Sequence, residues 1–94
     1  MKQDAVEAAA WYSKAAELGH AAAMYWLGLC YNNGKGVKQD KAEGYKWTIL
    51  AAEQGDEDAK TELNDMNRDL SNLFSKKNYE EGKRRAEAWR LQHG

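Results

Sequence analysis

Three side chains could bind a soft metal ion or act as a nucleophile: His20, Cys30 and His93. Their spacing matches no compact zinc site, in which ligands come in closely spaced pairs. Cys30 has no histidine close in the sequence to activate it, so we interpret it as a small buried apolar residue. No metal or other cofactor is predicted, and so few catalytic groups predict that the protein is not an enzyme.

Two further segments could bind phosphate. Gly34-Lys35-Gly36 has glycines beside a lysine, but a phosphate loop follows a strand, and a turn explains these glycines. Residues 76–94 carry six bases and three acids, net +3, whereas residues 56–75 carry two bases and six acids, net −4. We interpret the two segments as antiparallel helices that neutralise each other. Nucleic-acid binding is the alternative, which the chain's net charge of −1 disfavours.

The strongest pattern in the sequence is an internal repeat with an offset of 36 residues. Lys2-Gln3-Asp4 recurs as Lys38-Gln39-Asp40, and Ala15-Ala16-Glu17 recurs as Ala51-Ala52-Glu53. The other pairs at this offset are Trp11 and Trp47, Gly19 and Gly55, Ala23 and Ala59, and Leu27 and Leu63. A fixed period of this length predicts units that bury their apolar faces by stacking on one another.

Each repeat carries the start and stop signals of helices. An aspartate followed three residues later by a glutamate has the spacing of a capping box. A glycine just after a helix allows a left-handed end. These signals are Asp4 with Glu7, Asp40 with Glu43, Gly19 and Gly55. They predict helices over 4–18, 20–33 and 40–54, with a glycine-rich turn that ends the second of them.

The second repeat loses its turn residues, because Gly34 and Gly36 correspond to Leu70 and Asn72. Apolar side chains at 59, 63, 66, 70 and 73 keep a helical spacing. We therefore expect one extended helix over 57–74, a loop at 75–77 and a last helix over 78–92 that begins with a capping box at Asn78.

The outer face of the repeat also changes between the two copies. Ser13 and Lys14 correspond to the apolar residues Ile49 and Leu50. We expect the last helix to cover these two side chains through Tyr79 and Trp89.

Around the turn, the chain resembles the Sel-one-like repeat, a relative of the tetratricopeptide repeat. The matching motifs are Ala15-Ala16-Glu17-Leu18-Gly19, Leu27-Gly28-Leu29-Cys30-Tyr31-Asn32-Asn33-Gly34-Lys35-Gly36-Val37 and Asp40, within residues 2–63. The resemblance implies an all-α solenoid, a right-handed superhelix of helix pairs with a concave face. It divides a single domain, 1–94, into repeats at 2–37 and 38–74 and a capping helix at 78–92.

The resemblance also implies a role as an adaptor, with no catalytic residue shared by the family. Bacterial members act as signalling adaptors, envelope scaffolds or neutralising partners of toxins. The predicted partner is therefore another protein or a peptide. The alternative is a structural cap of a longer array or a homo-oligomerisation unit.

Trp26 is the first candidate contact for a partner, because the second repeat has Glu62 at this position. Tryptophan and tyrosine dominate binding hot spots, and Met24 and Tyr25 flank Trp26. The alternative is that Trp26 fills a groove against a neighbouring repeat or a second copy of the chain. The other candidates lie on the first helix of each repeat, which faces the concave groove in relatives: Trp11, Lys14, Tyr45 and Lys46.

The sequence also bears on the extent of the repeat array and on the cellular location of the protein. Met1 holds the register of Val37, which favours the C-terminal piece of a longer array; the alternative is an exposed first helix that self-associates. No run of eighteen apolar residues is present, so no membrane span is predicted. The single cysteine cannot form an internal disulfide, and a cytoplasmic location is slightly favoured. A periplasmic location stays open if a signal segment precedes this sequence.

Overall fold

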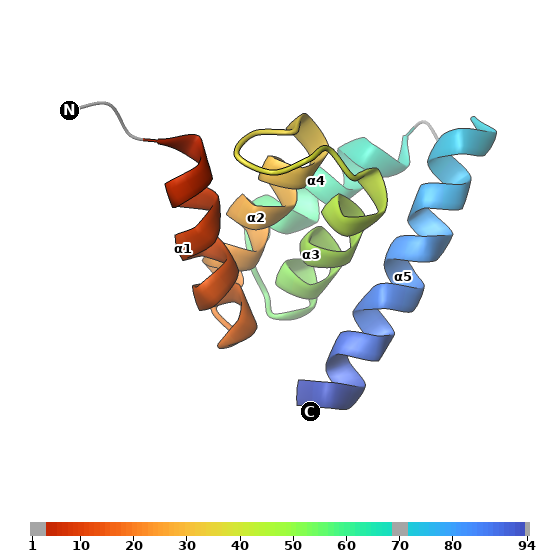
Figure 1. Ribbon diagram of the computed structural model, residues 1–94. Helices are drawn as coiled ribbons and strands as arrows, with labels where there is room; N and C mark the ends of the chain where they lie inside the picture. Colours follow the sequence, from red (N-terminus) through yellow and green to blue (C-terminus); the bar gives the residue numbers. More distant parts are fainter. Residues whose placement is uncertain (1–3, 69–71, 94) are drawn as a thin grey trace.

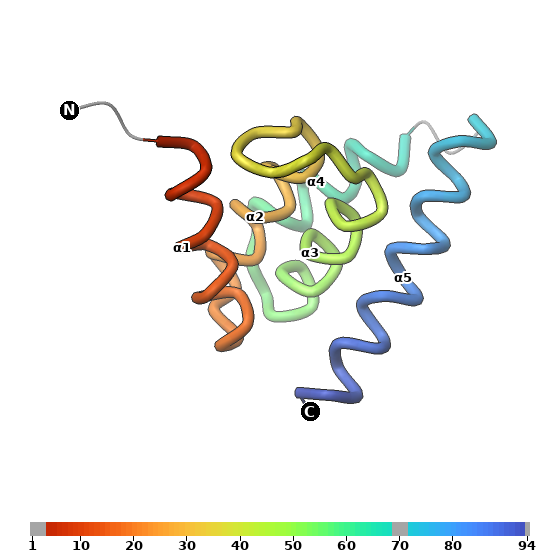
Figure 2. The backbone as a smooth tube through the Cα atoms, in the orientation of Figure 1, coloured from red at the N-terminus to blue at the C-terminus, as the bar shows by residue number. Residues whose placement is uncertain are grey.

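The computed structural model describes residues 4–68 and 72–93. Over these residues the chain folds into five helices (Figure 1): α1 (Ala5–Glu17), α2 (Ala21–Asn33), α3 (Lys41–Glu53), α4 (Glu57–Asn67) and α5 (Leu73–His93). Figure 2 follows the backbone back and forth through α1 to α4 and then along α5, with α3 between α1 and α5 in this view. The predicted all-α solenoid is confirmed. None of the described helices is both long and apolar enough to cross a membrane.

An aspartate caps the start of α1, α3 and α4. Asp4 accepts a hydrogen bond from the backbone N–H of Val6 (2.9 Å), and Asp40 accepts one from Glu43 (3.1 Å). Asp56 accepts one from Ala59 (2.9 Å). Each bond satisfies an amide that the helix leaves unpaired. The predicted N-caps at Asp4 and Asp40 are confirmed, but the capping box at Asp40 is not, because the Asp40 N–H donates to Tyr31 O (3.0 Å) and the Glu43 carboxylate contacts Arg85.

The first helix of each repeat ends in the same way. Gly19 and Gly55 have φ angles of 92° and 97°. After each glycine the backbone N–H turns back to the helix, from His20 to Ala15 O and from Asp56 to Ala51 O, both at 3.1 Å. This pattern satisfies the last carbonyls of the helix and needs a left-handed residue. The predicted glycine ends are confirmed.

The Gly34-Lys35-Gly36 segment is a turn. Gly34 ends α2 with a φ of 66°, and the N–H of Lys35 donates to Cys30 O (2.9 Å). Gly36, with a φ of 78°, lies so close to the carbonyl of Ala5 that a Cβ atom would collide with it. The turn therefore explains why glycine occupies both positions, as the sequence predicted.

The predicted extended helix over 57–74 is wrong. α4 ends at Asn67, and Leu73 begins α5. The Asn72 side chain accepts a hydrogen bond from Phe74 N (2.8 Å), which caps the new helix. Leu70, part of the predicted apolar stripe, lies outside the described residues.

The predicted loop at 75–77 and the start of the last helix at 78 are also wrong. Both segments belong to α5, which begins at Leu73. The Asn78 side chain does not cap a helix. It donates within α5 to Phe74 O (3.0 Å).

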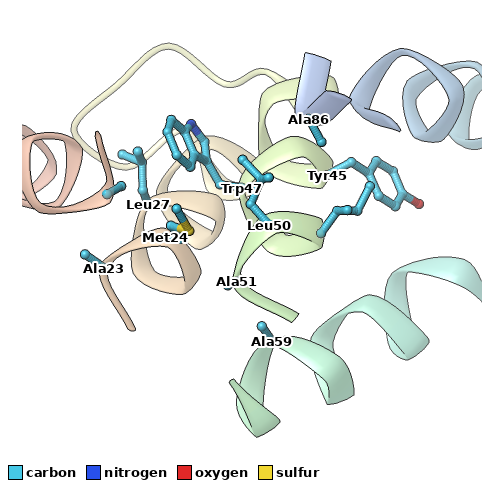
Figure 3. Packing of buried hydrophobic residues seen from close by; sticks show 11 residues of the cluster. Ala23, Met24, Leu27, Tyr45, Trp47, Leu50, Ala51, Ala59 and Ala86 are labelled. Carbon is cyan, nitrogen blue, oxygen red and sulfur yellow. The ribbon is translucent and has the colours of Figure 1, made fainter. Parts of the chain in front are cut away.

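The core gathers around α3, the helix that packs against α2, α4 and α5. Figure 3 shows Met24 and Leu27 of α2 on one side of α3, Ala59 of α4 on another, and Ala86 of α5 on a third. Trp47 and Tyr45 leave α3 on opposite sides, so both sides of the helix are covered by buried aromatic rings.

Two glycines set the distances between these helices. A Cβ on Gly28 of α2 would lie 2.7 Å from Thr48 Oγ1 and 3.2 Å from Gly44 O of α3. A Cβ on Gly82 of α5 would collide with Tyr45 Cβ and lie 3.0 Å from Ala42 O. Both crossings therefore bring helix backbones to a separation that only glycine allows.

The apolar pair of the second repeat is buried. Ile49 is 9% exposed and Leu50 is 2% exposed. Ile49 and Tyr79 line the same hollow between α3, α4 and α5. Trp89 instead packs edge-on against Trp47, with ring centroids 5.9 Å apart.

Candidate protein-binding surface

A hollow of about 400 Å³ lies between the first two helices. We call it the α1–α2 groove. Its lining residues are Asp4, Ala5, Ala8 and Tyr12 of α1, Trp26, Leu29, Cys30 and Asn33 of α2, and Lys35 of the turn. Small and aromatic side chains form its walls, with polar groups near one end. This composition is typical of sites that bind an apolar side chain of a partner.

Trp26 is the dominant side chain of this groove. It is 48% exposed, and its ring stacks on Tyr12 with centroids 6.3 Å apart and an interplanar angle of 22°. Tyr25 packs against it at 5.2 Å with a 60° tilt. Two aromatic neighbours hold the indole in place while about half of its surface stays free. A fixed and exposed indole loses little side-chain entropy on binding.

Two of the sequence-predicted contacts are wrong, because their side chains are buried. Met24 is 0% exposed and packs in the core between α2 and α3 (Figure 3). Tyr45 is 4% exposed; its hydroxyl donates to Met66 O (3.0 Å), and its ring meets Tyr79. The helical spacing alone did not show which face of each helix the core takes.

The other predicted contacts lie on or near the surface but do not form one site. Trp11 is 64% exposed, with the Lys14 ammonium 5.3 Å from its ring centroid. Lys46 lies 4.4 Å from the buried ring of Trp47 and 3.7 Å from the Glu43 carboxylate. Trp11 and Trp47 hold the same repeat position, yet only Trp47 is covered, by Trp89 of α5.

Sequence reasoning missed a cluster that joins the two ends of the molecule. Trp89 Nε1 donates to Glu17 Oε1 (2.9 Å), and His93 Nε2 lies 3.2 Å from the same oxygen. The His93 ring stacks on Trp89 at 4.0 Å. We call these three residues the end clasp. Glu17 and Trp89 are 72 positions apart, so no local pattern could have paired them.

Among the described residues, Arg85 and Arg90 of α5 pair with carboxylates on α3 or just before it. Arg85 contacts Asp40 (3.2 Å), Glu43 (3.1 Å) and Glu81 (3.0 Å). Arg90 contacts Glu53 of α3 (2.6 Å). These two arginines therefore do not neutralise α4 as predicted, and Asp69 of the acidic segment lies outside the described residues. On α4 and just after it, Lys60 pairs with Glu57 and Arg68 pairs with Asp65.

Asp40 should make the stability of the fold sensitive to acid. Burial alone would raise the pKa of this carboxyl, but hydrogen bonds from the Glu43 backbone and from Arg85 outweigh burial and lower the pKa below its ordinary value of 3.8. A lowered pKa contributes stability above the unfolded-state value, and this contribution is lost as pH falls through the folded value. We expect thermal melts between about pH 4 and pH 2 to show a shallower loss of stability in Asp40→Asn than in the wild type.

The matched control for this prediction is Asp58→Asn, an exposed carboxylate on α4. It should keep the wild-type slope against pH. Equal slopes for Asp40→Asn and the wild type would contradict the role of Asp40.

Cys30 lines the groove but is poorly suited to nucleophilic chemistry. Burial raises the pKa of its thiol, against a smaller opposing effect of Lys35. A raised pKa leaves less of the reactive thiolate at neutral pH. Within the described residues, no group of three or more histidine, cysteine or acidic side chains is placed to hold a metal ion. The groove therefore offers shape and aromatic surface for binding.

Comparison with known proteins identifies the repeat. A family profile described as the Sel1 repeat matches residues 1–20 and 21–56, which is more than half of the chain. The chain belongs to the Sel1 repeat family. Sel1 repeats generally mediate interactions between proteins. The Sel1 matches include α1, α2 and α3, so the α1–α2 groove lies on the repeat itself.

One curated relative is fungal. The chain is 38% identical over 66 residues to the chitin synthase regulator SKT5 of Malassezia restricta. The aligned part covers 70% of this chain but 5% of the relative. A fungal Sel1 relative gives no support to the bacterial context that the resemblance suggested. No solved structure matches the chain significantly.

Proposed function

We propose that this protein binds a partner protein or peptide through the α1–α2 groove and thereby acts as an adaptor or scaffold. The observation that carries the proposal is Trp26, which is held by Tyr12 and Tyr25 and remains about half exposed. Such aromatic anchors supply most of the binding energy in protein interfaces. Trp11 and Lys14 lie on the same helix as Tyr12 but do not line the groove, so they are not part of the proposed site.

The name of the fungal relative is compatible with such a role, because it describes a regulator of another protein. We infer from this that the partner is a larger protein whose activity or position the adaptor controls. Nucleic acid is a weaker candidate, since Arg85 and Arg90 of α5 are already paired with carboxylates of α3.

The second candidate function is structural, as the cap of a longer array or as a homo-oligomerisation unit. The observation that favours it is the burial of Ile49 and Leu50 and the close crossing of α5 over α3 at Gly82. We propose that residues 1–94 form one repeat domain, with repeats at 2–37 and 38–72 and, because α5 begins at Leu73, a capping helix at 73–93 instead of 78–92. If the chain is a homo-oligomerisation unit, its molecular mass in solution would depend on its concentration.

A pull-down that compares Trp26→Ala with the wild type tests the binding function. We expect Trp26→Ala to lose at least about 2 kcal/mol of binding, about 30-fold in affinity, because a central tryptophan is removed. The captured partner must then be purified and titrated against both forms. Circular dichroism must show equal helix content, because Trp26→Ala also removes the stack on Tyr12.

The matched control is Trp11→Ala, which removes an exposed indole that does not line the groove. It should keep most of the affinity. Equal losses in both variants would place the binding surface elsewhere on α1, and no loss in either would contradict the proposed groove.

A further inference from the structure

Asn32 is a buried side chain with poor hydrogen bonds. It is 7% exposed, and its Oδ1 atom has no hydrogen-bond partner among the described residues. Its Nδ2 atom donates to the sulfur of Met66 at 3.6 Å. A thioether sulfur is a weak acceptor, and a poorly bonded buried amide costs stability. An apolar side chain of similar size would suit this position better in the fold as it stands.

Met66 lies next to this amide and is also accessible from solvent. The Tyr45 hydroxyl donates to Met66 O (3.0 Å), which fixes this turn of α4 on α3. The Met66 side chain packs against the core but stays partly exposed. It lines a hollow of about 360 Å³ together with residues of α2, α3 and α5. A small solute that enters this hollow can therefore reach the thioether.

The pair of Asn32 and Met66 is not part of the repeat pattern. At the offset of 36 residues, Asn32 corresponds to Arg68 and Met66 corresponds to Cys30. The pair therefore occurs once, where the second helix of one repeat meets the second helix of the next. The packing that all repeats share does not explain why an amide faces a sulfur here.

The other described sulfur atoms are less suited to oxidation. Met24 is 0% exposed and lies in the core (Figure 3). The pKa of the Cys30 thiol is raised, chiefly by burial, which leaves less of the thiolate that oxidants attack. Among the described residues, Met66 combines access from solvent with a neighbouring N–H donor that lacks a strong acceptor.

We propose that Met66 is a methionine oxidation site for hydroperoxides, and that Asn32 donates a hydrogen bond to the sulfoxide oxygen that forms. The sulfur donates an electron pair to one oxygen of hydrogen peroxide, so that an S–O bond forms and the O–O bond breaks. The second oxygen takes the proton of the first and leaves as water. The sulfur thereby loses two electrons, and the peroxide is reduced.

Asn32 makes this site tolerant of its own oxidation. A sulfoxide usually disrupts a core, because it turns an apolar side chain into a polar one. At Met66 the new oxygen is a strong acceptor beside the Nδ2 atom of Asn32. The oxidised chain therefore keeps its fold and gains a stronger bond between α2 and α4. Because sulfoxides can be reduced enzymatically, the change is reversible.

Mass spectrometry of the folded full chain after treatment with hydrogen peroxide tests the site. Trypsin places Met66 in the peptide 61–68 and Met24 in the peptide 15–35. We expect one added oxygen on Met66 while Met24 stays reduced. If Met66 is oxidised only when Met24 is oxidised too, both report unfolding and the proposed site is overturned.

Thermal unfolding before and after oxidation tests the role of Asn32. Asn32→Leu removes the amide with little change in size. Oxidation should lower the melting temperature of this variant by about 4–8 °C more than that of the wild type, the shift expected for one hydrogen bond. Asn33→Leu is the matched control, because Asn33 is exposed and bonds to Leu29 O; it should respond as the wild type does. Equal shifts in Asn32→Leu and the wild type would overturn the role of Asn32.

A substitution that imitates the sulfoxide gives a second measurement without an oxidant. Met66→Gln places an amide oxygen near the position of the sulfoxide oxygen, and Met66→Leu leaves the site apolar. We expect Met66→Gln to melt above Met66→Leu when Asn32 is present and below it in the Asn32→Leu background. The same order in both backgrounds would contradict the proposed hydrogen bond. These measurements need no partner protein, so their outcome is independent of the proposed function.

Discussion

Leu50→Lys is expected to destabilise the protein by about 3–5 kcal/mol, the cost of an uncompensated buried charge. For a chain of this length, such a loss lowers the melting temperature by at least about 12 °C. Leu50 is 2% exposed and belongs to the cluster around α3. Circular dichroism of thermal unfolding measures the effect directly.

The repeat offers an internal comparison for this prediction. The first-repeat counterpart of Leu50 is Lys14, which is exposed on α1. The same helix position tolerates lysine there because α1 packs mainly on α2, whereas α3 packs against three helices. Leu18→Lys is the matched control, since Leu18 is 80% exposed and the change should cost less than about 0.5 kcal/mol. An unchanged melting temperature in Leu50→Lys would contradict the described core.

Gly82→Val is the second change with a large expected effect. The new side chain would collide with Tyr45 Cβ and press on the carbonyl of Ala42, so the backbones of α3 and α5 would have to separate. Overpacking of this kind costs about 1–3 kcal/mol. A corresponding fall in melting temperature of about 4–24 °C is expected.

Ala88→Val is the control for Gly82→Val, because it places the same β-branched residue at an exposed position of α5. It should shift the melting temperature by only a few degrees. If Gly82→Val and Ala88→Val have the same melting temperature, α5 does not approach α3 as closely as Gly82 indicates.

The repeat offset made the first three helices predictable. Glycines 19 and 55 and the aspartate caps act locally, within one turn of the helix, so their structural effect can be read from neighbouring residues. The boundary between α4 and α5 was not predictable in this way. The apolar spacing continues through it, and the signal that starts α5 is one side chain, Asn72, bonded to Phe74 N.

The binding surface was predicted only in part. Trp26 stood out because it departs from its repeat counterpart, and the structure leaves it about half exposed. The predicted partner contacts at Met24 and Tyr45 were wrong, because the burial of a side chain depends on which other helices pack against its own helix. Tyr12 and Ala8, which line the groove, correspond to Thr48 and Gly44 at the repeat offset. The contacts of Thr48 and Gly44 with α2 are tertiary contacts, which the sequence alone does not reveal.

The end clasp changes how this small array should unfold. In repeat proteins each unit normally contacts only its neighbours, so stability is additive and the ends fray independently. Here the Glu17 carboxylate of α1 accepts from Trp89 of α5, across the length of the chain. The last helix therefore cannot separate from α3 without also breaking its bond to α1, and this long-range contact raises the contact order of the fold. The molecule should behave as a single cooperative unit, with protection from hydrogen exchange shared by its two ends.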